Sequence, residues 1–173
     1  MQRRSRGVMV VRLSAIDIAV HWRWAPIIVL GTALLGYSIL PARYPSWDVP
    51  QTWLVSALAV VACEVGLLLH ELSHALVARR RGQLVERIVF HGFMAETVLG
   101  SEPAHDVLAA LSGPAMNLAL AGVFQALRLT LSGDSPADVL LALLVVGNLA
   151  TALVSLQPFG DSDGARALRA LRS

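Results

Sequence analysis

The sequence contains no lysine, and each of its 14 basic residues is an arginine. It contains a single cysteine, Cys63, so an intrachain disulfide is excluded. Charged residues make up only 15% of the 173 residues, whereas 55% are hydrophobic, and the mean hydropathy is +0.62. Soluble domains of this length rarely have such a composition, so we expect an integral membrane protein.

Long apolar stretches dominate the chain. The first, 25–40, is not followed by an A-x-A cleavage pattern, so we expect it to remain as a helix rather than to be removed as a signal peptide. Crossing a bilayer takes about 20 apolar residues, and four segments approach that length. We therefore predict an all-α polytopic membrane protein, with one transmembrane domain over 1–173 and no appended soluble domain. The predicted spans are roughly 24–40, 52–78, 107–127 and 138–156.

The arginines are not spread evenly along the sequence. They cluster before the first predicted span, after the second and after the fourth, whereas the connectors 41–51 and 128–138 contain only one arginine each, with one and two aspartates respectively. By the positive-inside rule, both termini are expected in the cytoplasm. We interpret the basic charge as a topological signal and predict no nucleic-acid binding. The clustered residues are Arg3, Arg4, Arg6, Arg12, Arg79, Arg80, Arg81, Arg87, Arg166, Arg169 and Arg172.

Residues 83–104 do not fit a span because charged residues and glycines interrupt them. The segment 84–90 has the β-branched content of a short strand, and a second strand could follow Gly92. We expect a small β-hairpin or a re-entrant loop between the second and third helices. An ordinary interfacial loop is the alternative.

His70 and His74 lie four residues apart in the second predicted span, so both project from one helix face and can reach one ion. Neutral imidazoles suit Zn²⁺, which in a catalytic site takes a third protein ligand and keeps one position open for water. Glu71 lies about 100° around the helix and can accept a proton from that water. The pattern predicts a zinc-dependent hydrolase with Glu71 as its catalytic base.

The membrane location strengthens this interpretation. A charged side chain in a span costs at least ~2.5–3.5 kcal/mol on insertion scales, so such residues are usually functional. The alternative for His70 and His74 is a pair of buried, hydrogen-bonded structural histidines. For Glu64, seven residues before Glu71, we favour a protonated, hydrogen-bonded structural carboxyl over a role in a water path to the metal.

The sequence resembles the site-2 proteases, a family of intramembrane zinc metalloproteases that cut transmembrane substrates in regulated signalling. The resemblance covers most of the chain, from His21 to its end. It rests on the segments 70–74, 111–117 and 158–166, which are similar to the H-E-x-x-H, G-P-x-x-N and P-x-x-x-x-D-G-x-R patterns of the family. The resemblance implies one zinc ion per chain and regulated intramembrane proteolysis in the plasma membrane of a bacterium or archaeon.

The third segment carries the remaining zinc ligand of the family, and the match points to Asp163. Asp161 is a rival because it stands where the family often has a second proline. The family usually has an asparagine eight residues before the ligand, and this chain has Ser155 there. Asn148, two helical turns earlier, could replace it. We therefore take Asn148, Ser155 and Asn117 as candidates for holding the substrate or the oxyanion.

The resemblance further implies a transmembrane protein substrate, such as an anti-sigma factor or the precursor of a signalling protein. Its peptide bonds must be unwound for attack, and an edge strand within 84–98 could bind the extended segment by strand addition. The predicted pairing residues are Val85, Arg87 and Val89. A haem-binding electron carrier that uses the histidines and a non-catalytic membrane adaptor are the alternative functions.

Overall fold

The computed structural model describes residues 8–13, 16–20, 22, 24–90, 95–99, 106–131 and 133–172. Four helical segments in this part of the chain are long and apolar enough to cross a membrane, namely Trp24–Arg43, Val49–Arg80, Val107–Arg128 and Pro136–Ser155. Their ends lie within three residues of the predicted spans. The expectation of an all-α polytopic membrane fold with about four transmembrane helices is confirmed.

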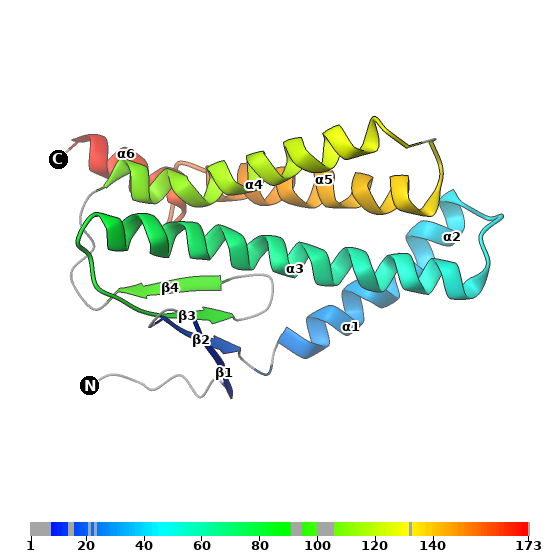
Figure 1. Ribbon diagram of the computed structural model, residues 1–173, viewed down its shortest axis with the longest axis horizontal. Helices are drawn as coiled ribbons and strands as arrows, with labels where there is room; N and C mark the ends of the chain where they lie inside the picture. Colours follow the sequence, from blue (N-terminus) through cyan, green and yellow to red (C-terminus); the bar gives the residue numbers. More distant parts are fainter. Residues whose placement is uncertain are drawn as a thin grey trace.

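Three helices form the centre of the bundle. α3 (Val49–Arg80), α4 (Val107–Arg128) and α5 (Pro136–Ser155) lie side by side in alternating directions (Figure 1). Small buried residues on α4 allow close approach of the neighbouring helices. These residues are Ala109, Ala110, Gly113 and Ala121.

Polar side chains determine where these helices begin. Asp48 accepts a hydrogen bond from the amide of Gln51 at 2.7 Å before α3, and Asp106 accepts from the amide of Leu108 at 2.9 Å before α4. Ser135 accepts from the amide of Asp138 at 3.1 Å before α5. Each acceptor satisfies an amide in the first turn that has no partner within the helix.

The first span is irregular. It consists of α1 (Trp24–Leu34), a π-helical turn η1 (Leu35–Ile39) and the short α2 (Leu40–Arg43). Leu40 packs with Val55 and Val139 in a small core at one end of the bundle, whereas α1 has no buried residue. The first span is therefore anchored firmly at its α2 end.

A four-stranded sheet packs along the C-terminal half of α3 (Figure 1). Its order is β1 (Val8–Leu13), β2 (Ile16–Val20), β3 (Val85–Phe90) and β4 (Ala95–Leu99). The β1–β2 and β3–β4 pairs are antiparallel, and β2 pairs with β3 in parallel, with Ile18 opposite Ile88. Ile18 and Ile88 bury their side chains against Ala75 of α3.

The sheet modifies the prediction for 83–104. The antiparallel pairing of β3 with β4 agrees with the expected hairpin, although residues 91–94 lie outside the described part. The two N-terminal strands were not predicted from the sequence. The segments 8–11 and 16–20 are rich in β-branched residues, which is the sequence signal for these strands. This signal is easily missed, because the neighbouring arginines are already explained by the positive-inside rule.

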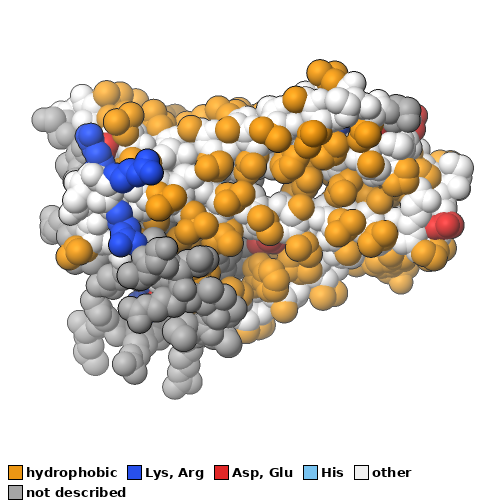
Figure 2. All heavy atoms as spheres, viewed as in Figure 1, with side chains coloured by type: hydrophobic (Ala, Val, Ile, Leu, Met, Phe, Trp, Pro, Cys, Tyr) orange, Lys and Arg blue, Asp and Glu red, His pale blue; other side chains and the backbone are white. Residues whose placement is uncertain are grey.

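The surface of the helices is apolar, and the charges lie at their ends. Figure 2 shows hydrophobic side chains spread along the helices and a group of arginines at one end. Large hydrophobic side chains are exposed on all four spans, as expected for contact with lipid. They include Val29, Leu30, Leu58, Val65, Leu118, Val123, Val146 and Leu153.

Candidate metal site

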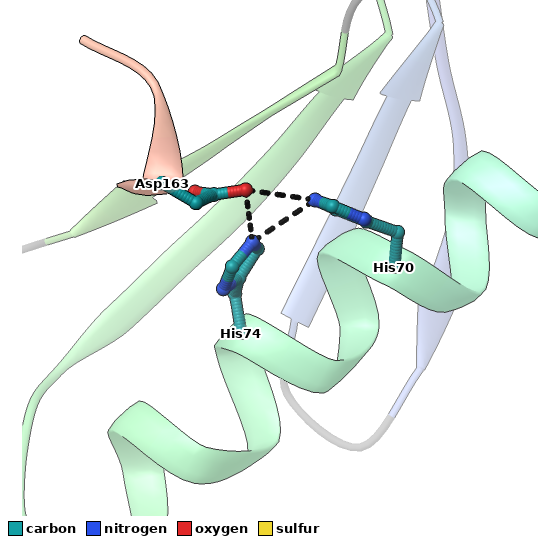
Figure 3. A group of neighbouring side chains, drawn as sticks. All are labelled: His70, His74 and Asp163. Atoms are coloured by element: carbon teal, nitrogen blue, oxygen red, sulfur yellow. Dashed lines mark hydrogen bonds and ion pairs between the residues drawn. The ribbon is translucent and has the colours of Figure 1, made fainter. Parts of the chain in front are cut away.

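His70 and His74 project from one face of α3 toward the same point (Figure 3). Their Nε2 atoms are 3.1 Å apart, and the residues are only 3% and 4% exposed. This places two imidazole nitrogens together inside the bundle, in the half of α3 that ends at Arg80.

Asp163 joins the two histidines from the far end of the described chain. Its Oδ2 lies 3.1 Å from Nε2 of His70 and 3.2 Å from Nε2 of His74. Asp163 is the first residue of the helix α6 (Asp163–Arg172), which packs against α4. The irregular backbone after α5 therefore extends to residue 162.

The loop before α6 is shaped by glycine. Gly160 has a φ of +69°, a backbone conformation that favours glycine. A Cβ atom at Gly164 would clash with the backbone carbonyls of Leu156 and Gln157. Both glycines allow the chain to turn sharply at the end of α5 and bring Asp163 back toward α3.

Asp161, the rival ligand, lies outside this group. Its side chain is fully exposed, and its nearest ionic partner is Arg169, at 3.9 Å. Of the two candidates, the structure brings only Asp163 to the histidines.

Hydrogen bonds on the opposite ring nitrogens orient both imidazoles. Nδ1 of His74 lies 2.7 Å from the backbone carbonyl of Ala109, and Nδ1 of His70 contacts Oδ1 of Asn117. Since a carbonyl oxygen only accepts, each Nδ1 must carry the proton. Each Nε2 is then left with a lone pair that faces the carboxylate of Asp163, and a cation is the natural partner for such a cluster.

The donors match a tetrahedral zinc site. Ligand atoms about 2.0–2.1 Å from a tetrahedral ion lie about 3.3 Å from one another. The three distances between the donor atoms are 3.1, 3.1 and 3.2 Å. A Cβ atom at Gly113 would clash with Nε2 of both histidines, so the glycine of α4 keeps this space open. The residues present therefore fit a three-ligand metal site.

The charge state of Asp163 fits as well. Burial raises the pKa of its carboxyl, but in the metal-free cluster the imidazoles of His70 and His74, when they carry a proton on Nε2, outweigh burial and lower the pKa below its usual value. Arg166 adds a cationic group 3.6 Å from the other carboxylate oxygen. Asp163 is therefore ionised at neutral pH, the state that a metal ligand requires.

Glu71 lies directly after His70 on α3 and is 8% exposed. A carboxylate next to the ligand pair, buried but on an adjacent helix face, is where a base for a hydrolytic reaction would stand. Glu64, two turns earlier, accepts a hydrogen bond of 3.1 Å from Nε1 of Trp24. Sequence reasoning did not identify Trp24 as the partner of Glu64.

Two of the three residues predicted to hold the substrate or the oxyanion are asparagines. Asn117 and Asn148 are 1% and 2% exposed and bonded to each other, with Nδ2 of Asn117 donating to Oδ1 of Asn148 at 2.9 Å. Oδ1 of Asn117 contacts Nδ1 of His70, on the side of the ring away from the metal cluster. The hydroxyl of Ser155 donates to the carbonyl of Ala152 at 3.1 Å. The described contacts of both asparagines are with His70 and with each other, and their role in holding a substrate or an oxyanion stays a prediction.

The predicted strand-pairing residues need correction. Val85, Arg87 and Val89 lie on β3, which pairs with β2 on one side and β4 on the other. An inner strand has no free edge, so these residues cannot pair with a substrate. Within 84–98, the edge of the sheet is β4.

A cavity of about 250 Å³ lies between the first span, α3 and α5. Apolar side chains form most of its wall, and Glu64 and Thr151 supply polar groups. No sequence pattern indicates this cavity, because it depends on how the first span packs against the others. Its other lining residues are Gly31, Leu35, Ala59, Val60, Cys63, Leu67 and Leu143.

Comparison with known proteins finds relatives that are named as zinc metalloproteases. No protein-family model matches it. A Mycobacterium tuberculosis protein named as zinc metalloprotease Rip3 is 35% identical over 165 residues, which is 92% of this chain and 42% of the relative. A Synechocystis protein named as zinc metalloprotease sll0528 is 28% identical over 175 residues, covering 96% of this chain and 44% of the relative. The chain thus spans less than half the length of these curated relatives.

A solved structure has the same fold. The site-2 protease from Methanocaldococcus jannaschii superposes with a TM-score of 0.67 at 22% sequence identity, over 96% of this chain and 72% of that protein. Together with the four apolar helices, this similarity identifies an integral membrane protein.

Proposed function

Since the chain belongs to the site-2 protease family, we propose that it is an intramembrane zinc metalloprotease. Its reaction would be the hydrolysis of a peptide bond within or near the transmembrane segment of a membrane-anchored signalling protein. The observation that carries the proposal is the convergence of His70, His74 and Asp163 on one point beside Glu71.

His70, His74 and Asp163 would hold the metal, which when bound supplies a Lewis acid that acidifies water. Glu71 takes a proton from the attacking water and passes it to the leaving nitrogen of the cleaved bond. Burial of the cluster between α3, α4 and α6 excludes bulk water from the reacting groups. The same burial strengthens the electrostatic interactions among them.

The haem alternative fits the cluster poorly. Nε2 of His70 and Nε2 of His74 face each other at 3.1 Å with a carboxylate against both, which leaves no room for a porphyrin between them. His21, His91 and His105 lie outside the described residues. The adaptor alternative is opposed by the complete set of ligands and the base.

The test is cleavage of a transmembrane reporter by wild type and by Glu71→Gln. The variant is expected to lose at least about 100-fold in cleavage, the lower end of what a general base contributes, and to retain zinc. Glu64→Gln is the matched control, because it changes another buried glutamate of the same helix and keeps an acceptor for Trp24. Equal cleavage by wild type and Glu71→Gln would refute the protease proposal.

The edge strand β4 is the proposed docking site for the unwound substrate. Support comes from its position at the sheet edge and from the packing of the sheet against the half of α3 that bears His74. Neighbouring residues of a strand direct their amides to opposite sides, so Thr97→Pro and Val98→Pro form a matched pair. One of the two should lose cleavage with zinc retained. Unchanged cleavage in both folded variants would contradict strand addition.

We place the basic end of the bundle in the cytoplasm, with both termini on that side. Arg79–Arg81 and the arginines of α6 lie at this end, near the group of arginines in Figure 2. The proposal depends on the positive-inside rule. It is tested by thiol labelling of single cysteines introduced at Arg80 and at Asp134 in a Cys63→Ala background, where only the second should react from outside intact cells.

A further inference from the structure

A row of hydrogen bonds crosses three helices behind His70. It begins on α5, where Nδ2 of Asn148 donates to the carbonyl of Leu144 at 2.8 Å. Nδ2 of Asn117, on α4, donates to Oδ1 of Asn148 at 2.9 Å. Nδ1 of His70, on α3, contacts Oδ1 of Asn117. Both asparagines are almost completely buried, so water does not compete for these groups.

The direction of this row is fixed at its α5 end. A backbone carbonyl can only accept, so Asn148 must turn its amide nitrogen toward Leu144 and its oxygen toward Asn117. Asn117 must then turn its own nitrogen toward Asn148, which leaves its oxygen facing His70. Each amide therefore has one orientation that satisfies all of its partners.

The two histidines obtain the same protonation pattern by different means. His74 donates from Nδ1 directly to the carbonyl of Ala109, a backbone group that cannot reverse. His70 donates to a side-chain amide, which could present its nitrogen instead of its oxygen if it were free to rotate. With the nitrogen of Asn117 toward Nδ1, the proton of His70 would move to Nε2, and Nε2 could no longer bind a metal ion.

We infer that Asn148 is a positioning residue that acts through Asn117 to keep the proton of His70 on Nδ1 and its Nε2 available to the metal. Gly66 of α3 makes room for this arrangement, since a Cβ atom there would lie 3.1 Å from Oδ1 of Asn148. The inference rests on the part of the proposed function in which His70 binds a metal ion, and it does not require proteolysis. Asn148 lies outside the three segments that carry the resemblance to the family.

The first test uses two measurements. Competition with a chelator gives the zinc affinity, and the visible absorption of the cobalt-substituted protein reports on the metal ligands. Loss of a hydrogen-bond partner that orients a ligating histidine typically lowers metal affinity about 10–100-fold, and we expect this loss in Asn148→Leu. Asn148→Ala, which adds no bulk near Gly66, should change in the same direction. Thr151→Val is the control, because Thr151 lies one turn away on α5 and its hydroxyl donates to the carbonyl of Gly147, at 2.9 Å, rather than to the row behind His70.

A rescue separates orientation of His70 from general packing. Aspartate at position 117 accepts through either oxygen, so it needs no orienting partner. In the Asn148→Leu background, Asn117→Asp should restore most of the lost zinc affinity. In the wild-type background the same change sets a carboxylate oxygen against Oδ1 of Asn148 and should weaken zinc binding. A structural role alone would not reverse the sign of the effect of Asn117→Asp.

Unchanged zinc affinity in Asn148→Leu and Asn148→Ala, or the same effect of Asn117→Asp in both backgrounds, would overturn the inference. Failure of the protease proposal looks different. It would leave the pattern of zinc affinities intact and show no cleavage of any transmembrane reporter by the wild type.

Discussion

The metal cluster and α1, the first helix of the first span, are held in opposite ways. His70, His74, Asp163, Asn117 and Asn148 are all buried, and hydrogen bonds or ion pairs connect them across α3, α4, α5 and α6. α1 has no buried residue. The polar contact that the structure describes from α1 to the bundle is the hydrogen bond from Trp24 to Glu64.

This difference shows where the fold is rigid and where it can yield. A connected buried polar network specifies one arrangement, because each broken bond leaves an unsatisfied group in a dry interior. A helix whose neighbours on most sides are lipid gains little from staying in one place, since lipid is as apolar as its side chains. We expect changes in the cluster to abolish metal binding and changes in α1 to leave it intact.

The largest expected effect comes from filling the space beside the histidines. Gly113→Ala puts a methyl group where it would clash with Nε2 of both His70 and His74, so zinc content should fall to background and cleavage should stop. Gly122→Ala is the matched control on the same helix, because nothing lies within 4 Å of its added Cβ. Metal analysis of both purified proteins is the measurement. Full zinc occupancy in Gly113→Ala would show that the cluster is not as tightly packed as described.

A smaller effect is expected from releasing α1. Trp24→Phe removes the hydrogen bond to Glu64 and leaves a buried carboxyl without that partner, which costs about 1–3 kcal/mol. Thermal unfolding in detergent should shift to lower temperature while zinc affinity stays at the wild-type value. Glu64→Gln, which keeps an acceptor for Trp24, should be close to wild type. Loss of zinc in Trp24→Phe would contradict the distinction between the metal cluster and α1.

The smallest effect concerns the ion pair between Arg81 and Asp106, which links the end of α3 to the start of α4 at a distance of 2.5 Å. Burial raises the pKa of Asp106, but Arg81 and the amides of Ala109 and Leu108 outweigh it and lower the pKa. A lowered pKa in the folded state means that the stabilisation is present above the unfolded pKa and disappears as pH falls through the folded pKa.

Asp106→Asn keeps the helix cap and removes the charge. Arg81 is half-exposed, so the pair should contribute no more than about 1 kcal/mol. At neutral pH the variant should unfold at a slightly lower temperature than wild type, and the difference should shrink below about pH 3.9, the unperturbed value for aspartate, and vanish once the pH is below the folded pKa. A difference that persists at still lower pH would assign the stabilisation to something other than this charge.

The parts of the fold that depend on local sequence could be predicted. Hydrophobic length alone located the four spans, and the four-residue spacing of His70 and His74 on a helix predicted a shared face. The hairpin of β3 and β4 followed from β-branched residues. These signals are local, and nothing elsewhere in the described chain overrides them.

The parts of the fold that depend on contacts between distant segments could not be predicted from the sequence. The sequence does not indicate that Gly113 lies against the ligand nitrogens, or that Asn117 meets Asn148 across two helices. β2 pairs in parallel with β3, although the first two spans separate these strands in the sequence. No local sequence pattern reveals this pairing. The contacts of the asparagines with His70 could therefore not be predicted, because they depend on how α3, α4 and α5 pack together.

The central claim is that His70, His74 and Asp163 bind one zinc ion, and the most direct measurement is X-ray absorption at the zinc edge of the purified protein. We expect one zinc ion per chain with two imidazole nitrogens and carboxylate oxygen at about 2.0–2.2 Å, and loss of this signal in Asp163→Ala but not in Asp161→Ala. A zinc site that survives in Asp163→Ala with its imidazole and oxygen ligands unchanged would contradict it.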